Sequence, residues 1–356
     1  MQKQRIFFDN EELVKPDDQQ INEFINGPKS PFNRFVGNAN AIEKLKTAAY
    51  AALGKPNHEM NELAFAIFGP SSAGKTTIVK IYAETVRLPL IEISPKSVKT
   101  LEDVFKLINN TLSNEELSLT EIRKNQYILP PCILFFDEVH AMTDGIIQGL
   151  LKATEYDDGM LATENGKVID TTHVTWMIAT TDEGKLFDAF RTRFTNVQLK
   201  LLTKKEVAQI VQIANPDLPQ QVCEQVAHYN SRIPREALQF ARYMRLVKNM
   251  HQDKPWDDVA KQIATNEGID EFGMHEIHLK ILTALGQGPI AKNRIGNGTG
   301  KKDEEIEKFI LPWLLCSTDD SPALIDVINK GYVITQAGLD ELDKRNIKHI
   351  GYKALG

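Results

Sequence analysis

The segment GPSSAGKT, residues 69–76, has the residue types needed to hold the phosphates of a nucleoside triphosphate. It fits the phosphate-loop pattern G-x-x-x-x-G-K-[ST] at every fixed position. Its glycines let the backbone curl until N–H groups point at phosphate oxygens, and the helix expected after it presents its positive end. Lys75 can then reach the β- and γ-phosphates, and the hydroxyl of Thr76 can sit on Mg²⁺. The candidate residues for binding ATP and Mg²⁺ are Gly69, Pro70, Ser71, Ser72, Ala73, Gly74, Lys75, Thr76 and Thr77.

A second group of candidate residues ends a later apolar run. Residues 133–136 are apolar and lead into Asp137 and Glu138. At the end of a buried strand, the first acid can hold Mg²⁺ through water and the second can polarise the attacking water. Such a pair alone is equally consistent with a surface strand end, but after a phosphate loop it predicts ATP hydrolysis. His140 could contact the site of a neighbouring copy, but we expect it to be a surface residue or to stand behind the catalytic groups.

Hydroxyl and guanidinium groups follow further along the chain. Either Thr180 or Thr181, in the segment ATT, could orient water between the acids and the γ-phosphate. The segment FRTRF supplies Arg191 and Arg193. A guanidinium can neutralise charge on the γ-phosphoryl oxygens, and one supplied by a neighbouring copy would couple hydrolysis to assembly. Without the motifs upstream, two arginines at a helix end would be read as surface residues.

These residues need a framework, and apolar runs that alternate with helical patterns predict one over residues 31–202. The runs are residues 63–68, 88–93, 132–137, 174–180 and 196–201. Continuous apolar strands separated by helices indicate an α/β fold with a parallel sheet covered on both faces. The phosphate loop should lie at the carboxyl end of that sheet. Residues 1–30 are polar and turn-rich, which predicts an extended or partly disordered N-terminal arm.

Beyond residue 202 the pattern changes to helices. Thr203 and Glu206, in TKKE, form a capping-box pattern that opens a small helical lid domain over residues 203–267. Within it, Arg235 at a helix start could sense the γ-phosphate. Residues 268–356 show two helices, a strand pair and a final helix, the order found in a winged helix, which binds DNA more often than other partners.

The composition limits the class of protein. With 356 residues the chain suggests two or three domains of a soluble globular protein. Its net charge of −6 counts weakly against binding nucleic acid through bulk charge, and leaves room for a local basic face. No apolar run is long enough for a membrane span and no signal peptide is evident, so a cytoplasmic protein is expected. Widely spaced cysteines indicate neither disulfides nor a zinc site.

This order of motifs resembles the AAA+ superfamily. FGPSSAGKTT, FFDEVHAM and MIATTDEG occur in many of its members, whereas DEFGMHEIHLKIL with GQGPI and PWLL is more specific and resembles the RuvB family of branch-migration ATPases. The resemblance runs through most of the chain from Phe32 onward. It implies a homohexameric ring that uses ATP to move duplex or four-way-junction DNA in recombination and repair.

The resemblance also implies individual roles. They are phosphate binding by Lys75, Mg²⁺ binding by Thr76 and Asp137, water activation by Glu138, a first sensor at Thr180 or Thr181, an arginine finger at Arg193 with Arg191 as its companion, a second sensor at Arg235, and an adenine slot at Phe35 and Val36.

The chain departs from the family pattern at several places. Asn38 stands where the family usually has Gln, and residues 111–127 look like an insertion. Residues 157–170 contain an Asn-Gly turn and predict a hairpin. The equivalent hairpin in the RuvB family grips RuvA, but this one is closer in style to protein-unfolding rings. The arginine-bearing wing tip of the family is absent, which leaves Lys330 and Arg294 as the candidate DNA contacts.

Three alternatives stay open. A protein remodeller or unfoldase is favoured by the hairpin, and is disfavoured by the terminal winged-helix pattern and by the lack of an aromatic-hydrophobic-Gly pore loop in residues 94–105. A clamp-loader subunit would usually show Ser-Arg-Cys where this chain has Arg-Thr-Arg-Phe. An ATP-gated scaffold that hardly turns over is disfavoured by the intact acids and the intact finger.

Overall fold

The computed structural model describes residues 17–54, 64–114, 117–155, 158–186, 188–230, 233–297, 299–301, 305–315, 317–318, 321–329 and 331–350. These residues fall into two compact units. The first takes its residues from Met1–Phe35, Ala39–Phe68 and Gly74–Gln198, and the second from Val36–Asn38, Gly69–Ala73 and Leu199–Gly356.

The first unit is built on a five-stranded parallel sheet in the order β2-β5-β8-β1-β9. The strands are β1 (Phe65–Phe68), β2 (Leu90–Ile93), β5 (Cys132–Phe136), β8 (Val174–Thr180) and β9 (Thr195–Gln198). Every residue of β1, β5 and β8 is buried, which explains why these segments are continuous apolar runs. The predicted α/β fold with a parallel sheet is confirmed.

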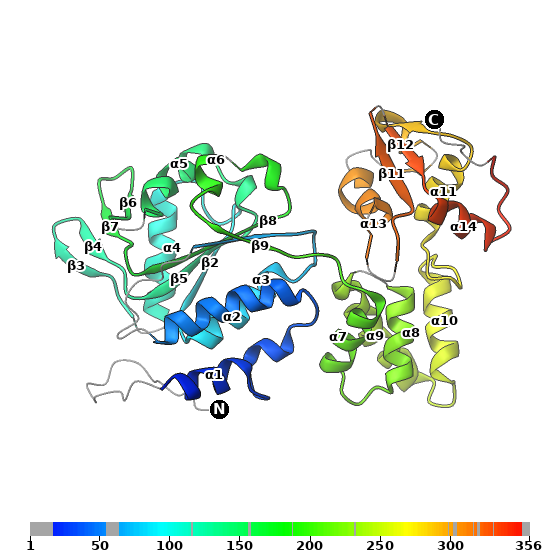
Figure 1. The fold of residues 1–356 in the computed structure, drawn as a ribbon, viewed down its shortest axis with the longest axis horizontal. Coiled ribbons are helices and arrows are strands. Elements are labelled where there is room, and N and C mark those ends of the chain that lie inside the picture. Colours follow the sequence, from blue (N-terminus) through cyan, green and yellow to red (C-terminus); the bar gives the residue numbers. More distant parts are fainter. Residues whose placement is uncertain are drawn as a thin grey trace. The chain divides into compact units, whose positions relative to one another are not determined.

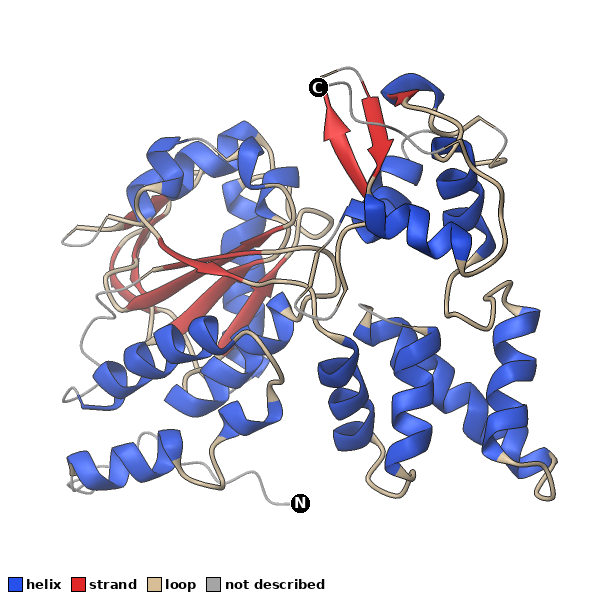
Figure 2. Cartoon of the chain, turned by 45° about the vertical axis from the view of Figure 1, so that its right-hand side comes forward, coloured by secondary structure: helices blue, strands red, loops and turns tan. Residues whose placement is uncertain are grey.

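Helices cover both faces of this sheet, as the two ribbon views show (Figures 1 and 2). The helices α2 (Ala39–Gly54) and α3 (Lys75–Val86) lie on one face, and α4 (Leu101–Asn114) and α5 (Asp144–Ala153) on the other (Figure 1). Because α3 follows β1 directly, the connection between them lies at the carboxyl end of the sheet, where the sequence predicts it. No helix of the described residues is long and apolar enough to cross a membrane.

Residues 18–26 of the predicted N-terminal arm form a helix, so the prediction of an extended or partly disordered segment is wrong for them. The helix α1 (Asp18–Asn26) starts with a capping box, in which the Gln20 N–H donates to Asp17 Oδ1 at 2.8 Å and the Asp17 N–H donates to Gln20 Oε1 at 3.1 Å. Ile21 and Ile25 are buried, and their spacing of four residues places them on one face. A mostly polar segment thus forms a helix because two apolar residues share a face; residues 1–16 lie outside the described residues.

A second, smaller sheet of the first unit has the order β3-β4-β7-β6. Its strands are β3 (Thr120–Arg123), β4 (Gln126–Ile128), β6 (Met160–Ala162) and β7 (Val168–Asp170). The antiparallel pair β6–β7 confirms the hairpin predicted in residues 157–170, and its Gly166 has a φ of +75°. The segment 111–127 forms the end of α4, β3 and most of β4, and β4 pairs with β7 in parallel. The strands β3 and β4 and the hairpin β6–β7 therefore form one sheet.

The second unit begins with four helices around a common apolar core. They are α7 (Lys204–Ala214), α8 (Gln220–Tyr229), α9 (Pro234–Met250) and α10 (Trp256–Asn266). The capping box between Thr203 and Glu206 is present at the start of α7, as predicted. Pro234 occupies the first turn of α9, where its missing N–H costs no hydrogen bond.

The rest of the second unit has its own apolar core. Its elements are α11 (Glu276–Leu285), β10 (Ile290–Ala291), η5 (Lys292–Arg294), the π-helical turn η6 (Ile306–Ile310), α13 (Leu311–Leu315), β11 (Ile325–Ile328), β12 (Gly331–Ile334) and α14 (Gln336–Asp343). The three strands form an antiparallel sheet in the order β10-β12-β11. The predicted strand pair and final helix are confirmed.

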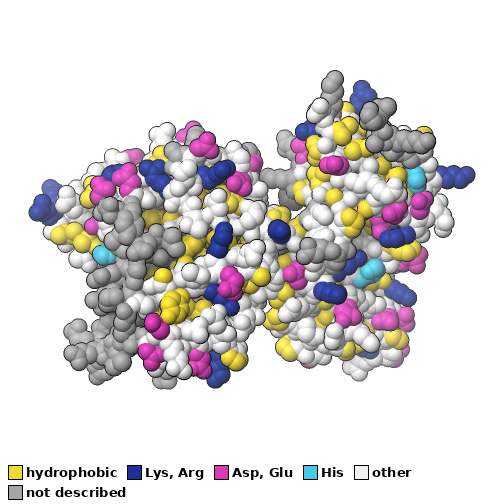
Figure 3. Space-filling model, viewed as in Figure 1, with side chains coloured by type: hydrophobic (Ala, Val, Ile, Leu, Met, Phe, Trp, Pro, Cys, Tyr) yellow, Lys and Arg dark blue, Asp and Glu magenta, His cyan; other side chains and the backbone are white. Residues whose placement is uncertain are grey.

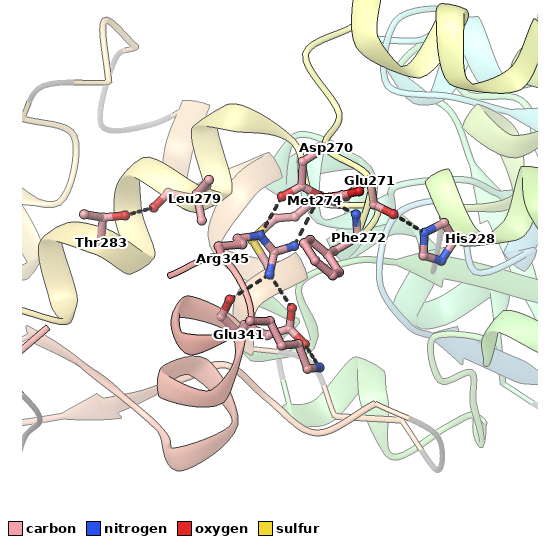
Figure 4. Close-up of polar contacts among 10 residues, drawn as sticks. His228, Asp270, Glu271, Phe272, Met274, Leu279, Thr283, Glu341 and Arg345 are labelled. Atoms are coloured by element: carbon pink, nitrogen blue, oxygen red, sulfur yellow. Dashed lines mark hydrogen bonds and ion pairs between the residues drawn. The ribbon is translucent and has the colours of Figure 1, made fainter. Parts of the chain in front are cut away.

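Arg345, just after α14, forms an ion pair with the segment that precedes α11 (Figure 4). Arg345 Nε donates to Asp270 Oδ2 at 2.5 Å, and Arg345 Nη1 donates to Glu341 Oε2 at 2.6 Å. The guanidinium also lies 4.8 Å from the centre of the Phe272 ring. One arginine therefore joins the turn before α11 to the end of α14.

Candidate active site

The phosphate loop joins β1 to α3 through an irregular backbone. Gly69, Ser72 and Gly74 all have positive φ angles, of +156°, +64° and +94°. The curl is closed by a hydrogen bond of 3.3 Å from the Ala73 N–H to the Pro70 carbonyl. Helix α3 then begins at Lys75, so that the N–H groups of its first turn lie next to the curl. Ser71 and Thr77 are exposed on either side of this turn.

Both fixed glycines are required by close packing as well as by backbone conformation. A Cβ atom on Gly69 would lie 2.7 Å from the Leu199 carbonyl oxygen. One on Gly74 would lie 2.9 Å from the Phe35 ring. The structure thus brings Phe35, predicted for the adenine slot, to the phosphate loop, while the neighbouring Val36 is buried.

The four residues predicted for phosphate, metal and water chemistry come together. The Lys75 side chain is 6% exposed, and its Nζ lies 3.8 Å from Glu138 Oε1. Thr76 Oγ1 donates to Asp137 Oδ2 at 3.2 Å. Burial lowers the pKa of Lys75, and the carboxylates of Glu138 and Asp137 oppose that shift.

The hydroxyl of Thr76 and the carboxylate of Asp137 fit a Mg²⁺ ion, because this cation prefers oxygen ligands and retains several waters. Within the described ranges, no group of three or more His, Cys, Asp or Glu residues could hold a metal by protein ligands alone. A cation between Thr76 and Asp137 would therefore complete its coordination with phosphate oxygens and water.

The two candidate sensor threonines have different environments. Thr181 donates from its N–H and its hydroxyl to Glu138 Oε2, at 3.2 and 3.1 Å. Thr180 is fully buried, and its Oγ1 lies 2.7 Å from His140 Nδ1. His140 Nδ1 also lies 3.3 Å from Glu138 Oε2. Of the two expectations for His140, the structure supports a residue behind the candidate catalytic groups, because its Nδ1 contacts both Thr180 and Glu138.

The candidate arginines pair with acids of their own unit. Arg191 Nη1 lies 3.3 Å from Glu183 Oε1, and Arg193 Nη2 lies 3.7 Å from Glu155 Oε1. Arg191 is the last residue of α6 (Asp188–Arg191), and Arg193 follows this helix. The Arg193 side chain is 31% exposed. Arg235 is exposed in the first turn of α9, in the second unit.

Asn38 has a structural role that its position in the sequence did not reveal. Its Oδ1 accepts from the Lys200 N–H at 2.7 Å, and its Nδ2 donates to the Lys200 carbonyl at 3.3 Å. Its φ of +53° suits asparagine better than most residues. The side chain thus holds the segment after Phe35 to the connection that leads into α7.

The candidate DNA contacts are only partly described. Arg294 is exposed at the end of η5, and Lys330 lies outside the described residues. The strand β11 exposes two apolar side chains, Val327 at 49% and Ile328 at 40%. Hydrophobic side chains also gather on the face of this domain that Figure 3 shows. The strand pair therefore presents apolar groups beside its turn.

Comparisons with known proteins agree with this geometry. Residues 65–201 match the family described as ATPase family associated with various cellular activities (AAA). The chain is 26% identical over 342 residues to the Holliday junction branch migration complex subunit RuvB of Campylobacter hominis, covering 91% of this chain and 92% of the relative. It is 24% identical over 345 residues to the RuvB of Leuconostoc mesenteroides, covering 92% of this chain and 90% of the relative.

The fold has a solved counterpart. The structure of the Thermotoga maritima RuvB Holliday junction branch migration motor aligns with a TM-score of 0.65 at 20% identity, covering 87% of this chain and 95% of the other. A mutant of the same protein aligns with a TM-score of 0.68 at 21% identity, covering 88% and 96%. The phosphate-loop geometry agrees with the AAA match over residues 65–201, and the chain is similar to RuvB proteins along most of its length.

Proposed function

We propose that this chain is a subunit of an ATP-driven ring motor that moves branched DNA, driving Holliday-junction branch migration in recombination and repair. The observation that carries this proposal is the extent of the similarity. It covers 91% of the chain and so continues beyond the AAA match at residues 65–201 into the second unit. Many ATPases share the AAA region, whereas the elements after it distinguish one kind of machine from another.

In the proposed reaction, Lys75 binds the β- and γ-phosphates of ATP, and Thr76 and Asp137 hold Mg²⁺. The ion supplies charge neutralisation when it is bound. Glu138 takes a proton from the water that attacks the γ-phosphorus, and the bond from the γ-phosphorus to the β–γ bridging oxygen breaks to release ADP. Thr181 lies within hydrogen-bond distance of this acid, which supports its role as a sensor beside it.

A ring of identical copies would give roles to the remaining candidate residues. We infer a homohexamer in which Arg193, with Arg191 beside it, reaches the γ-phosphate bound by a neighbouring copy, and Arg235 senses the γ-phosphate from the lid. Residues 31–202 then form the large ATPase domain, 203–267 the lid and 268–356 the winged-helix domain. Phe35 and Val36 border the adenine; the contact of Phe35 with the phosphate loop supports this.

The proposed substrate is duplex or four-way-junction DNA, contacted by Arg294 and Lys330. The hairpin of residues 157–170 is the proposed contact for a RuvA-like junction-binding protein. The pairing of this hairpin with β4, in one sheet with β3, supports its use as a contact surface.

ATPase assays with different nucleic acids test the function. The purified chain should hydrolyse ATP slowly alone and several-fold faster with four-way-junction DNA, with less stimulation by linear duplex. Junction DNA with labelled arms should be resolved into duplex products in the presence of ATP. The Lys75→Ala variant is the control, because it should show neither activity. Hydrolysis that responds to no DNA would contradict the motor.

A second candidate is a protein remodeller, favoured by the exposed Val327 and Ile328 on the wing. The same assay distinguishes the two, with an unfolded protein replacing DNA. Stimulation by the unfolded protein, together with no response to four-way-junction DNA, would select the remodeller.

A further inference from the structure

The two carboxylate oxygens of Glu138 have different surroundings. Oε2 accepts two hydrogen bonds from Thr181, at 3.2 Å from the N–H and 3.1 Å from the hydroxyl. It also lies 3.3 Å from His140 Nδ1. Oε1 faces Lys75, whose Nζ is 3.8 Å away. One oxygen is therefore anchored, and the other faces the lysine of the phosphate loop.

His140 connects this acid to the buried end of β8. Its Nδ1 lies 2.7 Å from the hydroxyl oxygen of Thr180, a residue with no exposed surface. The Thr180 hydroxyl donates to the Asp182 carbonyl at 3.3 Å and accepts from the Asp182 N–H at 3.0 Å. His140 thus contacts both Glu138 and a threonine whose own position is fixed by the backbone.

The chemistry of these partners decides which imidazole nitrogen carries the proton. An ionised carboxylate can only accept hydrogen bonds, and the Thr180 hydroxyl has the Asp182 carbonyl as an acceptor for its own proton. A favourable contact between His140 Nδ1 and both oxygens therefore requires the proton on Nδ1. The structure thus favours the Nδ1–H form of His140.

The backbone brings the acid and the imidazole together. Glu138 has φ +48° and ψ +47°, a left-handed conformation that a side chain with a Cβ adopts at a cost. The Asp137 carboxylate accepts the Glu138 N–H at 3.0 Å, and a hydrogen bond of 2.9 Å from the Ala141 N–H to the Glu138 carbonyl closes the turn η3 (Val139–Ala141). This turn folds His140 back onto Glu138.

We propose that His140 is a positioning residue for ATP hydrolysis: its Nδ1–H is hydrogen-bonded to Thr180 and lies 3.3 Å from Oε2 of Glu138, so that it stabilises this oxygen beside the two donors of Thr181, and Oε1 is the atom that takes the proton of the attacking water. This inference rests on the proposed role of Glu138 in activating water. In this proposal His140 acts through Glu138. It keeps the acid aligned with the end of β8, where misalignment of about 1 Å can cost a hundredfold in rate.

Two substitutions of similar size separate this role from general packing. In His140→Asn, the amide nitrogen can take the place of Nδ1, whereas in His140→Gln it reaches the position of Nε2. We expect His140→Gln and His140→Ala to lower kcat about tenfold, while KM and the affinity for ATPγS change less than about twofold. His140→Asn should recover most of the lost kcat. A role in packing alone would give no advantage to asparagine.

The outcomes are distinguishable from a failure of the proposed function. Wild-type protein without ATPase activity would refute the function itself. Active wild-type protein with unchanged kcat in His140→Gln, or with His140→Asn no faster than His140→Gln, would overturn the positioning role. His251→Gln is the matched control, since His251 is exposed on the lid and should leave kcat unchanged. Thermal melting of each variant identifies any loss of kcat that comes from unfolding.

A readout independent of catalysis tests the same contact. Nitrogen NMR of the full chain, labelled in its eight histidines, should show the Nδ1–H tautomer for the resonance that disappears in His140→Asn. The Nε2–H tautomer for that resonance would overturn the proposal, whatever the ATPase rates.

Discussion

At the scale of single residues, Lys75 is a buried amine at the centre of the proposed nucleotide site. Its side chain is 6% exposed, and an ammonium group removed from water is costly unless charges or hydrogen bonds compensate it. Glu138 and Asp137 provide that compensation, since both oppose the effect of burial on the Lys75 pKa. A triphosphate would bring further negative charge to the same amine. The Lys75 amine is therefore already held in place where the proposed phosphate contact would form.

We expect Lys75→Ala to weaken the affinity for ATP about a hundredfold, because a charge-assisted contact worth roughly 3 kcal/mol is lost. Titration of a fluorescent ATP analogue measures this loss. Lys80→Ala is the matched control on the same helix, because Lys80 is exposed and pairs with Glu92 at 2.9 Å. An unchanged affinity in Lys75→Ala would refute the phosphate-binding site.

At the scale of elements, the turn of residues 270–274 joins α10 to α11 and is held from two sides. Arg345 holds it through Asp270, and His228 of α8 lies 2.9 Å from the Glu271 carbonyl through Nε2 (Figure 4). Gly273 has a φ of +78°, and a Cβ there would lie 2.2 Å from the His228 carbonyl oxygen. The motif DEFGM is thus explained by packing: only glycine fits where the turn meets α8.

Removal of Arg345 should loosen this turn. Its side chain is 6% exposed, and Arg345→Ala removes the ion-pair partner of both Asp270 and Glu341. We therefore expect the free energy of unfolding to fall by about 3 kcal/mol. Denaturant unfolding measures the change. Arg345→Lys keeps the charge but loses the forked geometry, and should recover only part of the stability. Arg345→Ala with the stability of the wild type would show that the turn does not depend on this residue.

At the scale of the whole molecule, a single chain brings together most of the residues of the proposed hydrolytic site. The phosphate loop, both acids and both threonines lie in contact with one another, whereas Arg193 pairs with Glu155. A guanidinium that acts on the γ-phosphate of a neighbouring copy would make hydrolysis depend on assembly. This dependence is the property that a ring motor needs.

Mixing of two inactive variants tests whether the site is shared between copies. Arg193→Ala should bind ATP normally and hydrolyse it about a thousandfold more slowly, because the transition-state charge is not neutralised. Mixed with Lys75→Ala, it should regain part of the activity. At some interfaces between copies, the intact phosphate loop of an Arg193→Ala subunit then faces the intact Arg193 of a Lys75→Ala subunit. Arg123→Ala, an exposed arginine on β3, should behave as the wild type. A lack of recovery, with mixed assembly verified by crosslinking, would contradict action between copies.

Much of this fold follows from local patterns. The apolar runs predicted all five strands of the parallel sheet. The Asn-Gly turn predicted the hairpin β6–β7, and the capping box at Thr203 predicted the start of α7. Each of these signals lies within a few residues of the element that it defines. The helix α1 was missed because its apolar face consists of Ile21 and Ile25 in a polar segment.

The sequence by itself determined which groups could bind and cleave a triphosphate, because the phosphate loop and the acids each lie in a short continuous segment. Only the tertiary structure decided which side chains meet across the sheet. His140 reaches Thr180, and Asn38 reaches Lys200, through contacts between segments far apart in the chain. The position of β8 beside β5 sets the first of these contacts, and strand order is a property of the packed sheet rather than of any local pattern.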